Sequence, residues 1–510
     1  MLAPEASNKF LRFFYELIQD MEDSDEQALE AVLPLGEKKI RVPEPKVPLQ
    51  IHLGGEDGCT LELSPEIVVT ADGQFVHNGQ YLLFDPARFF SSVSGFLRLR
   101  RGASLTLGRK NPAQQQLLDY PDGVADKHLR LKLNEKGLSF KNRAPSRGVS
   151  IAPLTDRQSI KRMARWRQDK LRALADLLQA PIEEPPRAAA LDLLEQVIAI
   201  MRCEPHRLAG RDDRPGSVLR LPSQAIPIIV GDLHACIDNL LVVLTQNDFL
   251  DALTQGRAVL ILLGDAAHPD EPGREAEMET SIWLMDLIFR LKVRFPDRVF
   301  YLRGNHDSFA EDIAKGGVPQ GLVWEQALHD KRGKRYRDAM HRLYNRLPYI
   351  AYSADYICCH AGAPTMKYSR ADLINARRKP KLQLQLTRLR PRHSNKPDGY
   401  GASDVRRLRK HLDVTAQTPF IVGHTPRSAD EAVWSDAGGI KQHFVLFGAN
   451  PNKVGVLTRS GAEMLPLTYP VEPLMAVYNR LVRTGRFEAA MGDCDDNHLE
   501  ETLPDHQEEP

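Results

Sequence analysis

The sequence predicts an α/β core in the second half of the chain and an all-β region before it. After residue 226, short apolar runs alternate with segments of helical periodicity, which is typical of layered α/β folds. Between residues 38 and 155, apolar runs are separated by Gly, Asp, Asn and Pro, which favours a β-sheet domain. Five apolar runs of the α/β region end in Gly-flanked polar residues, so we expect a site at the strand ends.

Length and composition limit the functional classes. A chain of 510 residues exceeds a single core and predicts two or three domains. The net charge of +1 excludes a chain that seeks polyanions along its whole length but allows local basic patches. Six cysteines without regular spacing give no disulfide framework. We find no membrane-spanning run and no cleavable signal, so we expect a cytoplasmic protein with no membrane partner.

Shifts in composition predict the order of the domains. An amphipathic helix is expected within residues 1–37, where apolar residues such as Phe10 and Phe13 recur at helical spacing. The all-β domain covers 38–155, a helical connection follows over 156–215, and the α/β domain covers 216–470. Residues 471–510 are expected to form one helix and an acidic disordered tail.

The polar residues at the five strand ends have the chemistry of a two-metal site. Two neighbouring divalent cations need a bridging carboxylate and further oxygen or nitrogen ligands. Such cations activate a water for attack on phosphorus, and a histidine beside them can protonate the leaving oxygen. In chain order the residues are Asp232 and His234, Asp265, Asn305 and His306, His360, and His424.

The order of these motifs resembles the calcineurin-like metallophosphoesterases. Gly-Asp-x-His, Gly-Asp, Gly-Asn-His-Asp, His-Ala-Gly and Gly-His-Thr-Pro follow one another from Gly231 to Pro426. Within that family they look most like the PPP-type serine/threonine phosphoprotein phosphatases and their bacterial relatives. The similarity covers roughly residues 188–467 and includes the segments 344–348, 399–405 and 446–452. It implies a β-sandwich flanked by helices, in a bacterial protein.

The resemblance implies a role for each of these residues. It implies two divalent cations, with Mn²⁺ expected and iron or zinc as alternatives. Arg303, in the Arg-Gly-Asn-His run, would bind the substrate phosphate. Asp232 and His234 would bind the first cation, Asp265 would bridge both, Asn305, His360 and His424 would complete the second, and His306 would be the general acid.

The second motif departs from the family pattern. The family has Gly-Asp-x-x-Asp-Arg-Gly, whereas this chain has Gly264-Asp-Ala-Ala-His-Pro-Asp270. His268 stands where the family has the aspartate that orients the general acid, and Pro269 stands where it has a phosphate-binding arginine. We therefore expect Asp270 or Glu271 to support His306 as part of the catalytic set.

Replacements for the missing arginine are expected nearby. Arg274 follows the altered motif and is expected to reach the phosphate. The second phosphate-binding arginine of the family comes from the region of residues 377–410, a densely basic segment in which Arg392 is the nearest candidate. The segment lacks interleaved aromatic residues, so we do not expect nucleic acid as a partner.

Residues 102–148 carry a second, weaker resemblance, to forkhead-associated domains that bind phosphothreonine. Gly108-Arg109 matches a phosphate-contacting arginine, and His128 matches a histidine that supports the binding loop. The phosphate-binding serine of the family falls on Ala125 and an asparagine falls on Arg147. The strands that should follow Arg147 would then come from residues 40–92 in a permuted order. Phosphopeptide binding through Arg109, His128 and Arg147 and a purely structural sandwich both remain open.

These patterns favour a dimetal phosphatase that acts on phosphoserine or phosphothreonine in proteins. One alternative is a hydrolase of nucleotides such as dinucleoside polyphosphates. Another is a phosphopeptide-binding scaffold with an inactive phosphatase core. The expected partners are a phosphoprotein or a phosphorylated small molecule, together with a protein bound through the β-domain.

Overall fold

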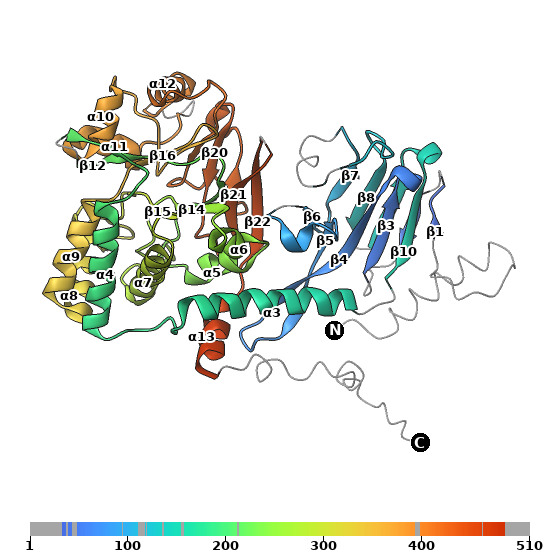
Figure 1. Cartoon of the computed structure of the whole chain (residues 1–510), viewed down its shortest axis with the longest axis horizontal. Coiled ribbons are helices and arrows are strands. Elements are labelled where there is room, and N and C mark those ends of the chain that lie inside the picture. The colour runs from blue at the N-terminus through green and yellow to red at the C-terminus, as the bar shows by residue number, and fades with distance from the viewer. Residues whose placement is uncertain are drawn as a thin grey trace, which may run out of the picture.

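The computed structural model describes residues 33–36, 39–42, 48–93, 95–110, 118, 120–134, 137–154, 158–211, 214–392, 398–461 and 463–484. The amphipathic helix expected near the N-terminus and the acidic tail expected at the C-terminus lie outside these residues. Two bodies are visible in Figure 1, a β-sandwich and a larger α/β body, and helix α3 runs along the base of both.

The sandwich consists of two antiparallel sheets, with strand orders β1-β10-β3-β4-β5-β6 and β2-β9-β8-β7. Alternate residues face its core, for example Leu129, Leu131 and Leu133 of β8, because side chains of a strand point to opposite faces in turn. The strands are β1 (Leu33–Pro34), β2 (Ile40–Val42), β3 (Leu49–Leu53), β4 (Cys59–Val69), β5 (Phe75–Phe84), β6 (Phe96–Leu99), β7 (Ser104–Leu107), β8 (Leu129–Asn134), β9 (Gly137–Asn142) and β10 (Val149–Pro153).

The α/β body contains two mixed sheets, with strand orders β15-β14-β13-β21-β22 and β11-β12-β16-β17-β18-β20-β19. The strands are β11 (Arg207–Ala209), β12 (Pro215–Arg220), β13 (Ile226–Val230), β14 (Ala258–Leu262), β15 (Val299–Tyr301), β16 (Ile350–Tyr352), β17 (Ile357–Cys359), β18 (Phe420–Val422), β19 (Val433–Trp434), β20 (His443–Leu446), β21 (Lys453–Ser460) and β22 (Glu463–Pro470).

Helices cover the outer faces of both sheets. The five-stranded sheet is covered by α4 to α7, and the seven-stranded sheet by α10 to α12. The helices are α3 (Gln158–Leu178), α4 (Arg187–Arg202), α5 (Ile237–Thr245), α6 (Phe249–Thr254), α7 (Glu279–Arg294), α8 (Gln320–Arg332), α9 (Lys334–Tyr344), α10 (Arg370–Ile374), α11 (Pro380–Arg388), α12 (Ala402–Leu412) and α13 (Leu474–Thr484).

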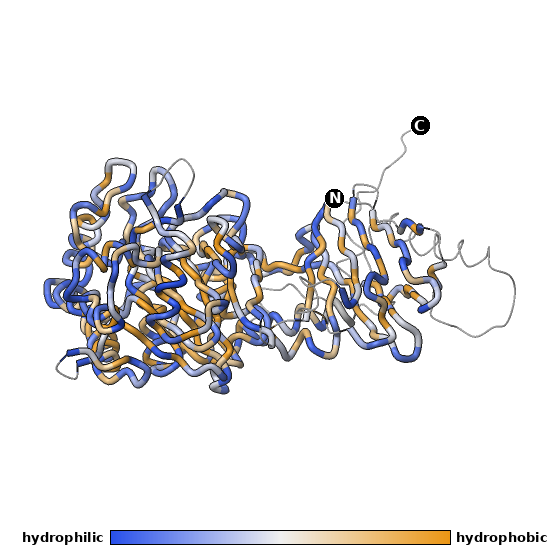
Figure 2. Tube along the Cα trace, turned by 90° about the horizontal axis from the view of Figure 1, so that it is seen from above, coloured by the Kyte–Doolittle hydropathy of each residue, from blue (hydrophilic) through white to orange (hydrophobic). Residues whose placement is uncertain are grey.

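The two sheets of the α/β body face each other across an apolar layer. Ile229 and Ile261 of one sheet pack in the same cluster as Cys358 and Ile421 of the other. Apolar segments fill the interior of both bodies in Figure 2. No helix in the part of the chain that the structure describes combines the length and apolar character needed to cross a bilayer.

The sandwich and the α/β body share one apolar core. Phe84, Phe89 and Phe96 of the sandwich belong to the same buried cluster as Met163 of α3 and Tyr469 of β22. The cluster is continuous, so the two bodies pack as one unit rather than as two domains joined by a free linker.

A buried ion pair lies at this junction. The carboxylate of Glu472 accepts from the Arg167 guanidinium at 2.5 Å and from the backbone N–H of Val69 at 2.7 Å, and both charged side chains are almost fully buried. Three segments far apart in the sequence therefore meet at one carboxylate.

Candidate metal centre

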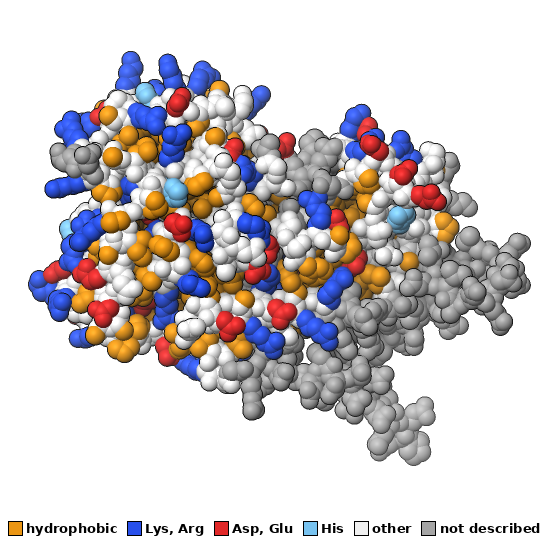
Figure 3. Space-filling model, in the orientation of Figure 1, with side chains coloured by type: hydrophobic (Ala, Val, Ile, Leu, Met, Phe, Trp, Pro, Cys, Tyr) orange, Lys and Arg blue, Asp and Glu red, His pale blue; other side chains and the backbone are white. Residues whose placement is uncertain are grey.

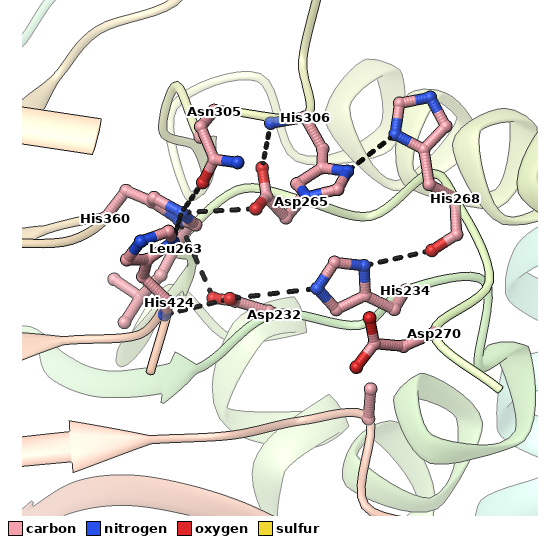
Figure 4. Close-up of polar contacts among 12 residues, drawn as sticks. Asp232, His234, Leu263, Asp265, His268, Asp270, Asn305, His306, His360 and His424 are labelled. Atoms are coloured by element: carbon pink, nitrogen blue, oxygen red, sulfur yellow. Dashed lines mark hydrogen bonds and ion pairs between the residues drawn. The ribbon is translucent and has the colours of Figure 1, made fainter. Parts of the chain in front are cut away.

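The strand ends of both sheets in the α/β body meet at one place (Figure 4). Asp232 and His234 follow β13, Asp265 follows β14, and Asn305 and His306 follow β15. His360 follows β17 and His424 follows β18 of the opposite sheet. Two sheets therefore contribute residues to the site at the strand ends that the sequence predicts. Apolar runs identify buried strands but do not tell which sheet each strand joins.

Four ligand atoms face one another at the centre of this group. His360 Nε2 lies 3.2 Å from Asp265 Oδ2, 3.0 Å from Asn305 Oδ1 and 3.3 Å from His424 Nδ1. His360 Nδ1 donates to the Leu263 carbonyl at 2.8 Å, which leaves a lone pair on Nε2. The Asn305 oxygen is also 2.8 Å from His424 Nδ1, so it faces acceptors only. Such a convergence of oxygen and nitrogen ligand atoms fits a bound cation.

The pKa of His360 supports this interpretation. Burial lowers the pKa of His360, but the carboxylates of Asp265 and Asp232 outweigh burial and raise it to about 10. Without a metal, a proton therefore neutralises part of the negative charge. A divalent cation would displace that proton, as ligand deprotonation usually accompanies metal binding.

A second set of ligands lies next to the first. His234 Nδ1 donates to the carbonyl of His268 at 2.9 Å, and its Nε2 faces Asp232 Oδ2 at 4.0 Å. Asp232 Oδ2 accepts from the backbone N–H of His424 at 2.8 Å, while Oδ1 is buried without a hydrogen-bond partner among the described residues. Burial raises the pKa of Asp232 to about 6. Asp232 Oδ1, which has no hydrogen-bond partner in the described part of the chain, and His234 Nε2 are therefore available to bind a second cation. Asp265 lies between the two sets of ligands.

The backbone around the ligands is strained. Of the ten described non-glycine residues with positive φ, five lie at this site: His234, Ala235, Asp265, His268 and His424. Such conformations cost roughly 1–3 kcal/mol each and cluster at functional sites.

Two glycines leave room for the carboxylates. A Cβ on Gly304 would lie 2.0 Å from Asp265 Oδ1, and one on Gly423 would lie 2.1 Å from Asp232 Oδ1. Any side chain at either position would displace a ligand.

His306 is held at the edge of the cluster by two contacts. Its backbone N–H donates to Asp265 Oδ1 at 2.8 Å. Its ring Nδ1 lies 2.9 Å from Nδ1 of His268, so one proton is shared between the two imidazoles. Its Nε2 lies 3.3 Å from the side-chain amide of Asn305 and so faces the ligands.

Neither Asp270 nor Glu271 makes a hydrogen bond or ion pair with His306, although the negative charge of Asp270 acts to raise the pKa of His306 against the effect of burial. Asp270 forms an ion pair with Lys315, and Glu271 pairs with Arg274 at 2.9 Å. The contact with His306 comes from His268, whose positive φ of 69° and whose N–H bond to Ser281 Oγ set its direction.

Residues 228–428 match the calcineurin-like phosphoesterase family. We call the α/β body that includes these residues the phosphoesterase domain. The ligand cluster lies within the matched residues and agrees with the metal dependence of that family.

Two solved structures are distantly similar to the chain. A protein serine/threonine phosphatase from Saccharomyces cerevisiae is 16% identical, and the match covers 56% of this chain and 90% of that one at a TM-score of 0.41. A cold-active protein-tyrosine phosphatase from a psychrophilic Shewanella is 12% identical, with 50% and 83% covered at a TM-score of 0.32. No curated protein matches the chain.

The three arginines predicted to bind phosphate in the phosphoesterase domain are engaged elsewhere. Arg303 donates to the Tyr344 carbonyl and lies over the Tyr344 ring. Arg274 pairs with Glu271 and Glu277, and Arg392 donates to the Gly399 carbonyl at 3.1 Å.

Arg390 was missed by the sequence analysis. Its side chain is exposed and makes no hydrogen bond or ion pair with the residues that the structure describes. It lies close enough to His424 for its charge to add to burial in lowering the pKa of that histidine to about 3. The sequence places Arg390 two residues before Arg392 in one basic run, and only the fold tells which side chain is near the metal ligands.

The three residues expected to bind a phosphopeptide lie in neighbouring loops of the sandwich. His128 accepts from the Ala125 N–H at 3.0 Å and bonds to the Gly148 carbonyl at 2.9 Å, so it links two loops. Arg109 pairs with Asp122 at 2.7 Å, and Arg147 donates to the Asp122 carbonyl. A phosphate would have to displace the Asp122 carboxylate from Arg109, and phosphopeptide binding stays a prediction.

Proposed function

We propose that the phosphoesterase domain hydrolyses phosphomonoesters at a dimetal centre and that its substrates are phosphoserine and phosphothreonine in proteins. The observation that carries the proposal is the group of acceptor atoms from Asp265, Asn305, His360 and His424, with Asp232 and His234 beside it. Such a group fits divalent cations, for which Mn²⁺ is our first candidate.

The residues around the two ligand sets would have distinct roles in the reaction. Two bound divalent cations would lower the pKa of a water and stabilise the charge on the phosphoryl oxygens. Asp265 and Asp232 neutralise the cations and hold the loops through the N–H groups of His306 and His424. The Nε2 atom of His306 faces the same space and would give a proton to the leaving oxygen.

Exposure indicates how a substrate reaches the centre. Asp232, Asp265 and His360 are buried, whereas Asn305, His306 and His424 are partly exposed. The ligands therefore open to solvent on one side, where a phosphorylated side chain on a protein surface can approach. Arg390 stands exposed near His424 and would bind the phosphoryl oxygens.

Metal removal tests the proposal directly. Protein stripped of metal by a chelator should release no phosphate from phosphoserine and phosphothreonine peptides, and Mn²⁺ should restore the release. Iron and zinc are added in parallel to identify the effective metal. Diadenosine polyphosphates serve as the competing substrates. A faster turnover of these nucleotides would replace the protein-phosphatase assignment, and no turnover of either substrate with any metal would reject an enzymatic role.

The role of Arg390 gives a second test. Because a charge-assisted contact contributes roughly 1.5–3 kcal/mol, Arg390→Ala should lower kcat/KM by about 10- to 150-fold. Arg335→Ala is the matched control, since Arg335 is exposed on α9 and its side chain makes no hydrogen bond or ion pair with the described residues. Steady-state rates with a small aryl phosphate measure both variants. Equal rates for wild type and Arg390→Ala would show that another group holds the phosphate.

A further inference from the structure

A strongly basic surface lies beside the metal centre. We call residues 363–413, which contain α10, α11 and α12, the basic cap. Among its described residues are 13 Lys and Arg against four Asp and Glu, although the whole chain has a net charge of only +1. Lys and Arg side chains project from this end of the α/β body in Figure 3. The excess of Lys and Arg over Asp and Glu is therefore concentrated at one end of the α/β body.

Much of this charge is not used inside the fold. Arg377 and Arg409 are held by backbone carbonyls and serve the structure. The side chains of Lys367, Arg406 and Lys410 are exposed and make no hydrogen bond or ion pair with the described part of the chain. Unpaired exposed cations repel one another, so this surface favours a negatively charged partner.

The basic cap also contains a shallow apolar groove. It is a shallow hollow of about 190 Å³, a volume that includes the open solvent above it. Met366 at its edge has 47% of its surface exposed, which is unusual for a large apolar side chain. The groove is lined by Met366, Tyr368, Leu373 and Leu408, with Arg407 and His411 at its rim. Its size suits one apolar side chain.

The groove is close to the metal ligands along the chain. Pro364, which also lines it, is four residues after His360, so it lies at most about 14 Å from that ligand. The N–H of Ala361 donates to the Leu386 carbonyl, which ties this stretch to α11. A bound peptide would need about four to six residues to reach from the groove to the metal centre.

We infer that the groove of the basic cap docks an acidic segment with one apolar residue, located four to six residues from the phosphorylated residue of a protein substrate. This inference rests on the proposed function and specifies its substrate class. The apolar side chain would enter the groove, while carboxylates on both sides of it would face Lys367, Arg406 and Lys410. The groove has a single aromatic residue, Tyr368, so it lacks the stacked platform that single-stranded nucleic acid uses.

A binding assay tests docking separately from hydrolysis. The probe is a fluorescent peptide with Glu-Leu-Glu-Glu placed five residues to either side of a serine, prepared with and without phosphate. We expect the unphosphorylated probe to bind the full chain, and Lys367→Glu/Lys410→Glu to weaken binding at least tenfold. Lys127→Glu/Arg335→Glu is the control, because it makes the same change in charge at exposed positions outside the basic cap. Replacing leucine with serine in the probe should also weaken binding.

Kinetics distinguish this inference from the proposed function. With the phosphorylated probe, Lys367→Glu/Lys410→Glu should raise KM about tenfold and leave kcat, and the rate on a small aryl phosphate, unchanged. Equal binding by both double variants would overturn the docking inference even if the enzyme is active. Docking without hydrolysis of any phosphate would instead reject the proposed function.

Two other occupants would also overturn the inference. If a chain ending at Thr484 binds the probe more than tenfold tighter than the full chain, the acidic C-terminal residues occupy the groove. If a single-stranded oligonucleotide displaces the fluorescent probe at a lower concentration than the unlabelled peptide needs to displace it, nucleic acid is the partner.

Discussion

Replacement of His306 by alanine should lower kcat for alkyl phosphates by roughly 10²- to 10⁴-fold, the usual contribution of a general acid. An alkoxide is a poor leaving group, and the Nε2 atom of His306 is the imidazole nitrogen that faces the ligand cluster from its edge. An aryl phosphate needs no such proton, so its rate should fall far less. The measurement is kcat for a phosphoserine peptide and for p-nitrophenyl phosphate with the same metal-loaded protein.

His329→Ala provides the matched control, because His329 is an exposed histidine of α8. The metal content of each variant must be measured, since the N–H of His306 bonds to Asp265. An equal loss on both substrates at full metal content would mean that His306 is not the proton donor.

The partner of His306 leads to a linked expectation. Burial lowers the pKa of His306 to about 4, and burial together with the charge of His306 holds the pKa of His268 well below its ordinary value. Both rings are thus neutral at pH 7. A carboxylate in place of His268 would stabilise the imidazolium and raise the pKa of His306.

His268→Asp should therefore increase the rate on alkyl phosphates. A general acid loses activity as the pH rises through its pKa, so a higher pKa moves this loss to higher pH. At a fixed pH above the pKa, each unit of increase raises the protonated fraction about tenfold. His268→Asn, which has similar bulk and no charge, is the control for pH–rate profiles. An identical profile for both variants would exclude an electrostatic role for this position.

Asp265→Asn should abolish metal-dependent turnover. The carboxylate lies between the two ligand sets, contacts His360 Nε2 at 3.2 Å and anchors the N–H of His306. Loss of an outer-shell partner alone costs roughly 10- to 100-fold in metal affinity, and loss of a direct ligand should cost more. Metal analysis and phosphate release measure both effects.

Asp297→Asn is the control for this variant, because Asp297 is half exposed and its ion pair, at 4.0 Å, is with the neighbouring Arg298. Normal metal content and normal turnover in Asp265→Asn would reject the dimetal centre. A normal metal content without turnover would instead limit the role of Asp265 to catalysis.

The strand ends were predictable because each combines two independent features of the local sequence. An apolar run such as Ile228–Val230 indicates a buried strand, and a following Gly-Asp or Gly-Asn gives a chain turn with an oxygen ligand. All five runs are strands that end at one site. The likeness of the motif order to one family then supplied the expected roles, and residues 228–428 match that family.

The errors concern side-chain direction, which no local pattern encodes. Asp270 and His268 are only two residues apart, yet the positive φ of His268 turns its ring to His306 while Asp270 pairs with Lys315. In the same way, Arg390 and Arg392 occupy one basic run, but only Arg390 lies free near His424. Burial and tertiary contacts decide these cases, and neither can be read from spacing.

The Glu472 carboxylate limits how this protein can be divided or recombined. It joins Val69 at the end of β4, Arg167 of α3 and the segment after β22, so the sandwich, α3 and the end of the α/β body are held together at one carboxylate. Loss of one partner of such a buried pair costs about 3–5 kcal/mol, a large part of the stability of a typical domain. An exchange of the N-terminal sandwich for one from another protein would need to bring α3 and the Glu472 segment with it. A phosphoesterase domain produced without the sandwich would leave the Glu472 carboxylate without its contact to the Val69 N–H.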